Sequence, residues 1–169
     1  MTGGEVLATV ALGSNLGDRE GALDRALAGM SALPKTRLVA RSRWRETEPV
    51  GGPPGQPRFL NGVARLATAL GARELLAELQ RLEREAGRAR EREVRNGPRV
   101  LDLDLVYYGE LALREPGLEL PHPRAEQRLF VLEPLAEIAP ELRHPLTKKT
   151  TREMLHALPA GGPAVRKAK

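Results

Sequence analysis

Two aspartates, Asp102 and Asp104, lie two positions apart in residues 99–108, which read RVLDLDLVYY. Alternating leucine and aspartate is typical of a β-strand, because successive side chains of a strand point to opposite faces. Both carboxylates then share one face, with Cα atoms roughly 6 to 7 Å apart by strand rise. Oxygen ligands at that separation can bind a common divalent cation. We interpret this strand as a candidate metal site.

The apolar residues that flank the two aspartates predict a central strand, where unpaired carboxylates would be costly unless cations neutralise them. The alternative is an edge strand with two aspartates in solvent. Arginine outnumbers glutamate six to three between residues 84 and 99, and this excess favours a polyphosphate ligand over a solvated surface loop. The six arginines are Arg84, Arg88, Arg90, Arg92, Arg95 and Arg99.

Length and composition limit the other possibilities. A chain of 169 residues with 41% hydrophobic content predicts one domain, residues 1–169, with residues 160–169 as a flexible tail. The absence of cysteine excludes disulfides and thiolate metal sites. No run of about 18 apolar residues and no leader are present, so we expect a cytoplasmic protein without membrane contact. The net charge of +5 allows nucleic acid or a nucleotide as partner.

Hydrophobic periodicity predicts the elements that position the aspartates. Strands are expected at residues 6–12, 36–45, 59–68 and 99–108, and helices at residues 18–32, with Asp18 as N-cap, and 72–86. This order is that of an α+β ferredoxin-like αβ plait, an antiparallel sheet with helices packed on one face. A C-terminal extension would add a hairpin near residues 111–113, a segment at 128–138 that turns helical, and a helix at 150–158.

Aromatic residues are scarce, and the only two phenylalanines, Phe59 and Phe130, each lie beside polar segments. Core packing is one interpretation, and stacking of a planar heterocycle between the rings is the other. The chain contains neither of the glycine-rich phosphate-binding motifs GxxxxGK[ST] and GxGxxG, so arginines and metal would have to hold any phosphates.

Several motifs together resemble the 6-hydroxymethyl-7,8-dihydropterin pyrophosphokinase family of folate biosynthesis. Their order and spacing over residues 7–145 make the resemblance specific. They are ALGSNLGD at 11–18, ETEPVG at 46–51, FLN at 59–61, GRAR at 87–90, NGPRVLDLDL at 96–105, LPHP at 120–123 and RLFVLEPLAEIAP at 128–140.

The resemblance implies an enzyme that transfers pyrophosphate from ATP to a pterin hydroxymethyl group, with two Mg²⁺ ions bound by Asp102 and Asp104. Arg88 and Arg99 would steady the transferring group. The implied ATP-binding residues are Gln80, Glu83, Arg90, Arg99, His122 and Arg128. The implied pterin-binding residues are Thr47, Pro49, Val50, Phe59, Asn61, Asp102 and Phe130. Only small-molecule partners are expected, and the chain would act as a monomer, with a weak dimer as the alternative.

Two other functions remain open from the residues alone. A basic αβ plait can bind RNA on its sheet, but that mode stacks bases on two or three aromatics within a strand of the R/K-G-F/Y type, and no such strand is present here. A two-metal nucleotidyl transferase also fits paired aspartates, and it would release pyrophosphate rather than AMP.

Overall fold

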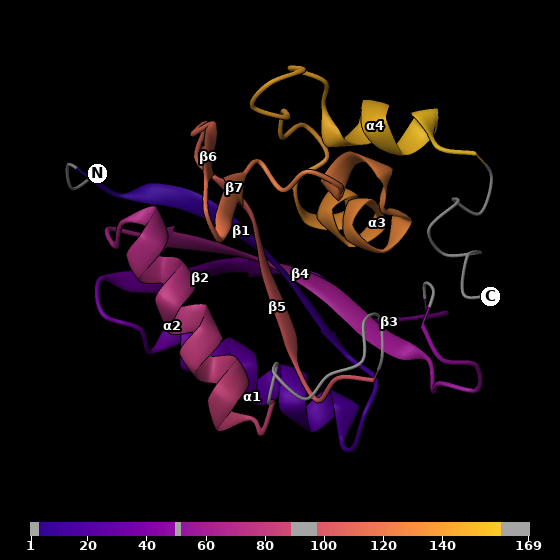
Figure 1. Cartoon of the computed structure of the whole chain (residues 1–169). Coiled ribbons are helices and arrows are strands. Elements are labelled where there is room, and N and C mark those ends of the chain that lie inside the picture. Colours follow the sequence, from indigo (N-terminus) through magenta and orange to yellow (C-terminus); the bar gives the residue numbers. More distant parts are fainter. Residues whose placement is uncertain (1–3, 50–51, 89–97, 160–169) are drawn as a thin grey trace.

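The computed structural model describes residues 4–49, 52–88 and 98–159, and Figure 1 shows the whole chain. The first half of the chain alternates strands with two long helices. The second half adds a small hairpin and two further helices. The elements are β1 (Val6–Ser14), α1 (Arg19–Ser31), β2 (Thr36–Arg41), β3 (Arg45–Thr47), β4 (Phe59–Thr68), α2 (Ala72–Glu85), β5 (Asp102–Tyr108), β6 (Leu113–Glu115), β7 (Leu118–Leu120), α3 (Leu129–Ile138) and α4 (Thr151–Ala157).

The main sheet is antiparallel, with the strand order β2-β4-β1-β5 and the short β3 paired with β4. Two strand–helix–strand halves interleave in this order, so the predicted ferredoxin-like plait is confirmed. The order also places β5 at an edge of the sheet. The prediction of a central strand was therefore wrong. The sequence of β5 is apolar because helices cover both of its faces, and not because it has a neighbouring strand on each side.

Helix ends follow the local signals in the sequence. The side chain of Asp18 accepts a hydrogen bond from the Gly21 amide at 3.1 Å, which is the N-cap contact expected for α1. In α2, Leu75, Leu79 and Leu82 recur at helical spacing and are buried. Both helices end within one residue of their predicted C-terminal limits.

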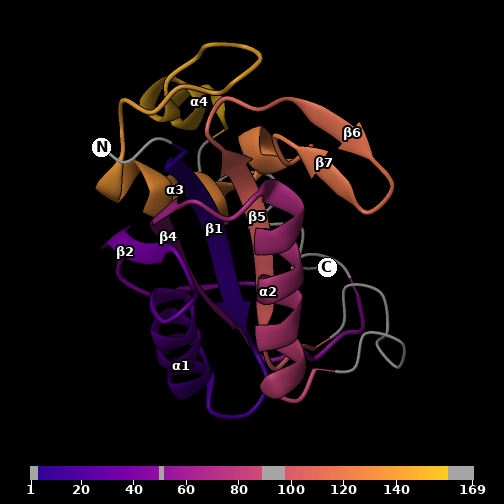
Figure 2. The same cartoon turned by 90° about the vertical axis from the view of Figure 1, so that its left-hand side faces the viewer.

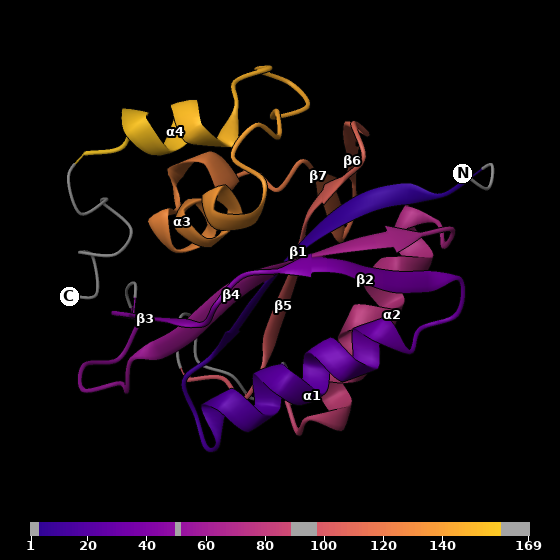
Figure 3. The ribbon, with the colours of Figure 1, turned by 180° about the vertical axis from the view of Figure 1, so that it is seen from behind.

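Helices cover both faces of the sheet (Figures 1 and 3). α1 and α2 lie side by side on one face, as Figure 2 shows, and enclose the larger core with leucines of β1, β4 and β5. α3 packs on the opposite face against Ala11, Val63 and Tyr107. The C-terminal extension thus covers the sheet face that α1 and α2 do not cover.

A β-bulge divides β5. Val10 pairs with Leu105, whereas Thr9 pairs with Tyr107, so Val106 is the extra residue. This insertion shifts the alternation of side chains beyond it. Tyr107 consequently joins the face that α3 covers, and Tyr108 turns to the other face, where its hydroxyl donates to the Leu70 carbonyl at 2.7 Å.

Two smaller expectations differ from the structure. The predicted strand at residues 36–45 is interrupted, because the Ser42 hydroxyl donates to the Arg43 carbonyl and accepts from the Val63 amide where β2 ends. The hairpin lies at β6 and β7, C-terminal to the expected position. No helix in the described part of the chain is long and apolar enough to cross a membrane.

Candidate active site

The two aspartates lie on the sheet face that carries α3. Leu101, Leu103 and Leu105 enter the core beneath α1 and α2, so the intervening Asp102 and Asp104 point the other way. Asp102 is paired with Gly13 of β1, and Asp104 is paired with Ala11. The predicted shared face is confirmed.

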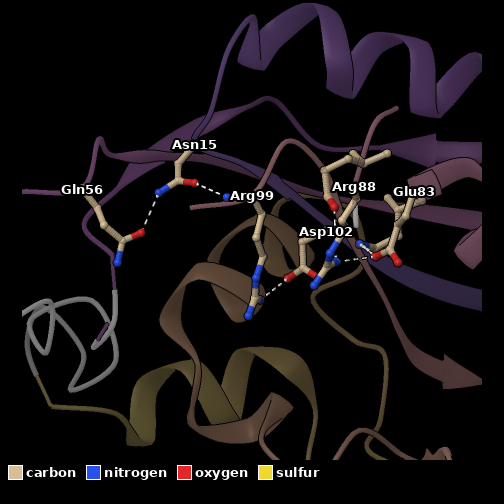
Figure 4. A network of polar contacts seen from close by, with 8 residues as sticks. Asn15, Gln56, Glu83, Arg88, Arg99 and Asp102 are labelled. Carbon is tan, nitrogen blue, oxygen red and sulfur yellow. Dashed lines mark hydrogen bonds and ion pairs between the residues drawn. The ribbon is translucent and has the colours of Figure 1, made fainter. Parts of the chain in front are cut away.

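Arg88 ties the end of α2 to the start of β5 (Figure 4). Its Nη1 donates to Asp102 Oδ1 at 2.8 Å, to Glu83 Oε2 at 2.8 Å and to the Leu101 carbonyl at 3.2 Å. The side chains of Arg88 and Glu83 are each only 2% exposed, whereas Asp102 is 21% exposed. The guanidinium therefore binds two carboxylates at once, the buried one of Glu83 and the partly exposed one of Asp102.

Glu83 has a position that the sequence did not predict. Its Oε2 also accepts the Leu103 amide at 2.8 Å, so one buried carboxylate fixes both Arg88 and the backbone between the two aspartates. A group with these bonds positions the site from below. Its expected contact with ATP stays a prediction.

Asn15, which lies in the sequence motif at 11–18, joins two loops at the site (Figure 4). Its Oδ1 accepts the Arg99 amide at 2.8 Å, and its Nδ2 donates to Gln56 Oε1 at 3.1 Å and to the Pro57 carbonyl at 3.0 Å. These bonds hold Arg99, whose Nη1 lies 3.5 Å from Asp102 Oδ2. In the sequence Asn15 follows shortly after the apolar run of residues 6–12, but no local signal reveals its distant partners.

His122 and Arg128 complete the charged surroundings of the aspartates. Burial is the main reason that the pKa of His122 falls to about 4, and the positive charge of Arg128 contributes. Burial also lowers the pKa of Arg128, which Asp104 opposes. Because His122 Nδ1 accepts the Arg124 amide at 3.2 Å, a neutral ring carries its proton on Nε2. The site thus offers a neutral donor beside several guanidinium groups.

The depressed pKa of His122 makes stability depend on pH. Between about pH 6.5 and 4 the unfolded chain binds a proton at this histidine and the folded chain does not, so folding stability falls as pH decreases through that window. We expect an NMR titration of the His122 ring to show a midpoint near pH 4, with the resonance assigned by its loss in His122→Gln. The variant should also show a shallower loss of stability over this window. A ring midpoint near 6.5 would contradict the buried, neutral state.

A polar cluster forms where β3 meets β4. Asn61 pairs with Gly13 across the sheet, and its Nδ2 donates to the Thr47 hydroxyl. Phe59 is the register partner of Thr47. A Cβ on Gly13 would lie 2.7 Å from Asn61 Oδ1 and 3.6 Å from the Phe59 ring, so glycine leaves the space that Asn61 uses. Thr47, Phe59 and Asn61 are therefore brought together as the resemblance implied.

The remaining predicted residues are placed less completely. Phe130 lies in the first turn of α3, half-buried, with the Arg128 guanidinium carbon 5.4 Å from its ring centroid. Pro49 is buried after β3, and Gln80 is half-buried on α2, one turn before Glu83. Two predicted residues lie outside the described residues, namely Val50 and Arg90.

Comparison with known proteins agrees with this arrangement. The family described as 7,8-dihydro-6-hydroxymethylpterin-pyrophosphokinase (HPPK) matches residues 9–140. The chain belongs to the HPPK family. The similar 2-amino-4-hydroxy-6-hydroxymethyldihydropteridine pyrophosphokinase of Pseudomonas aeruginosa is 47% identical over 153 residues, which are 90% of this chain and 92% of that protein. The protein of the same name from Bacillus subtilis is 41% identical, covering 86% and 85% of the two chains.

Solved structures support the fold. The wild-type HPPK-DHPS of Plasmodium falciparum superimposes with a TM-score of 0.66 at 12% sequence identity. The match covers 90% of this chain and 44% of that longer one. At this identity the likeness establishes the architecture, which for an HPPK chain is the αβ plait with helices added on the second face.

Proposed function

We propose that this chain transfers pyrophosphate from ATP to 6-hydroxymethyl-7,8-dihydropterin, giving AMP and the pterin diphosphate in folate biosynthesis. The observation that carries the proposal is the pair of carboxylates on one face of β5, with Arg88 and Arg99 on Asp102 and Arg128 acting on Asp104. Polyphosphate transfer needs both kinds of charge, because metal and cations together neutralise the phosphate oxygens. Membership of the HPPK family supports the same reaction.

Asp102 and Asp104 would hold two Mg²⁺ ions. Mg²⁺ binds through one or two protein carboxylates and completes its octahedron with water and substrate phosphates. The donor set fits this habit, because Asp102 and Asp104 present two carboxylates on one face of β5. When bound, the metal would supply charge neutralisation at the triphosphate.

The basic residues would divide the phosphate contacts between them. Arg99 lies at the opening, 23% exposed, and can turn a forked guanidinium to a transferring phosphoryl group. Arg88 would fix Asp102 and would help to steady the transferring phosphoryl group. The Nε2 proton of neutral His122 and the guanidinium of Arg128 would bind the ATP side.

The pterin would bind at the polar cluster where β3 meets β4. A flat ring with an amide-like edge needs paired donors and acceptors, which Asn61 and Thr47 offer, and an apolar face, which Phe59 and Phe130 offer. We propose stacking between these two rings rather than core packing as their role.

Gly13→Ala tests whether Asn61, in the polar cluster where β3 meets β4, binds the pterin. The added Cβ would contact Asn61 Oδ1 and displace that side chain, so we expect pterin binding to weaken by about 1–3 kcal/mol with ATP binding retained. Isothermal titration with pterin and with an ATP analogue measures both. Gly71→Ala is the matched control, because there a Cβ makes an ordinary 3.4 Å contact. Unchanged pterin affinity in Gly13→Ala would remove Asn61 from the site.

Product analysis tests the reaction itself. Purified protein with ATP, Mg²⁺ and the hydroxymethyl dihydropterin should form AMP and pterin diphosphate in equal amounts, and AMP should not form without the pterin. Release of pyrophosphate would indicate nucleotidyl transfer instead. Salt-dependent RNA binding without any AMP would indicate a binding module.

The assembly and location of the chain belong to the same proposal. We propose a single domain over residues 1–169 that works as a cytoplasmic monomer. Sedimentation at micromolar concentration should give one species of monomer mass, and a weak dimer would appear as a concentration-dependent shift.

A further inference from the structure

A second pocket lies on the same sheet face, beyond the bulge of β5 and away from the two aspartates. It has a volume of about 270 Å³ and lies where β1, β4 and β5 meet the loop between α3 and α4 (Figure 1). Its walls are partly apolar. Its lining includes Leu7, Arg65, Tyr107, Leu142, Arg143 and Lys148.

Two of the lining residues, Arg65 and Tyr107, belong to one row of paired residues. Thr9 of β1 is the register partner of Arg65 on β4 and of Tyr107 on β5. Tyr107 enters this row only because Val106 is bulged. The row is polar, although Thr9 is fully buried and Tyr107 is only 2% exposed.

Each member of the row has a buried polar atom without a hydrogen-bond partner among the described residues. These atoms are Thr9 Oγ1, Arg65 Nε and the Tyr107 hydroxyl. Burial raises the pKa of Tyr107 to about 12, so its hydroxyl keeps its proton near neutral pH. Burial lowers the pKa of Arg65, but a guanidinium starts so high that it still keeps its charge. Buried donors are normally satisfied by protein, water or ligand. Arg65 and Tyr107 line the pocket, so their two donors indicate an acceptor that the described residues do not supply.

The charge around the pocket has one dominant sign. Arg65, Arg143 and Lys148 line it, and Glu110, whose side chain is 88% exposed, lies 3.8 Å from Lys148. His144 is buried, and burial lowers its pKa, so it adds no charge near neutral pH. Its Nε2 lies 3.8 Å from Oε1 of Glu126, a carboxylate whose charge also helps to raise the pKa of Tyr107. The cations therefore outnumber the lining carboxylate three to one.

We propose that this pocket binds a small organic anion, with a carboxylate or phosphate group on Arg65 and Tyr107 and an apolar body against Leu7 and Leu142. The guanidinium supplies charge-assisted hydrogen bonds, and the tyrosine hydroxyl supplies a further donor. This inference is independent of the proposed function, because none of these residues contributes to the pyrophosphoryl-transfer site.

Benzoate, benzamide and inorganic phosphate are suitable probes. Benzoate and benzamide have nearly the same shape, and only benzoate carries a negative charge. In amide NMR titrations of the full chain we expect benzoate to saturate shifts at Leu7, Gly109 and His144, with benzamide at least about tenfold weaker. Saturation by phosphate at the same amides would also support the site and would identify phosphoryl compounds as its ligands.

Variants separate a built site from general attraction to a basic protein. Arg65→Met should weaken benzoate binding at least about tenfold, and Tyr107→Phe should weaken it severalfold. Arg37→Met, which removes an equal charge from an exposed position on β2, should bind as the wild type does. Thermal melts establish that each variant is folded, and Tyr107→Phe retains the buried ring if Arg65→Met fails to fold. Equal shifts with benzamide, or binding unchanged in both pocket variants, would overturn the proposal.

Discussion

Asp102→Asn and Asp104→Asn are each expected to reduce the rate of AMP formation at least about a hundredfold, with the fold retained. Each change removes one unit of negative charge from the face that would hold Mg²⁺, and metal stabilisation of a phosphoryl transition state is worth several kcal/mol, where 1.36 kcal/mol is tenfold in rate. Asparagine keeps the shape and one acceptor oxygen, so Arg88 retains a partner at position 102. Steady-state kinetics over a range of Mg²⁺ concentrations is the measurement.

Glu141→Gln is the charge-matched control for these two variants. Glu141 lies on the surface, 66% exposed, in an ion pair with Arg152, so its neutralisation should leave the rate near that of the wild type. Circular dichroism and thermal melts exclude unfolding as the cause of any loss. Near-normal rates in both aspartate variants would remove the metal from β5.

Arg88→Met is expected to destabilise the folded chain by about 3–5 kcal/mol, which is a typical cost of leaving a buried charge unpaired. The change removes the cation that Glu83 and Asp102 share, and Glu83 is too deeply buried to find water instead. Chemical denaturation gives the free energy of unfolding. The same variant should lose pyrophosphoryl transfer even where it remains folded, because Asp102 is no longer held.

Two further variants make this result specific. Arg81→Met on α2 also removes an arginine with two glutamate partners, Glu78 and Glu85, but these lie at the surface, so a much smaller change is expected. The double variant Glu83→Gln/Arg88→Met leaves no buried charge and should recover part of the stability lost in Arg88→Met. A loss in Arg88→Met no larger than in Arg81→Met would show that the buried pair does not form in solution.

Much of the fold was predictable because the main signals are local. The N-cap at Asp18, the leucine stripe of α2 and the alternation of aspartate and leucine in β5 each concern side chains only a few positions apart. The order of strands and helices then limits the topology to few choices. The shared face of the two aspartates was predictable for the same reason, since alternation alone places Asp102 and Asp104 together.

The rest depends on contacts between distant segments. The residues of β5 by themselves did not reveal its edge position, because burial between two helical layers produces the same apolar sequence as a central strand. The bonds of Asn15 to Arg99 and Gln56 span 84 and 41 residues, and nothing near Asn15 announces them. The role of Glu83 was likewise missed, since a glutamate among the polar residues of α2 is expected to face solvent, whereas the chain after α2 folds back to bury it.

Because β5 lies at an edge of the sheet, Glu83 also affects whether the protein can associate with itself. An exposed edge strand offers free amides and carbonyls to any strand from another molecule, which is a route to aggregation. On the outer side of β5 the Leu103 amide is bonded to Glu83, and the Val106 carbonyl accepts the His122 amide. The contacts that arrange the site therefore also block strand addition, so variants that loosen Glu83 should be monitored for self-association as well as for lost activity.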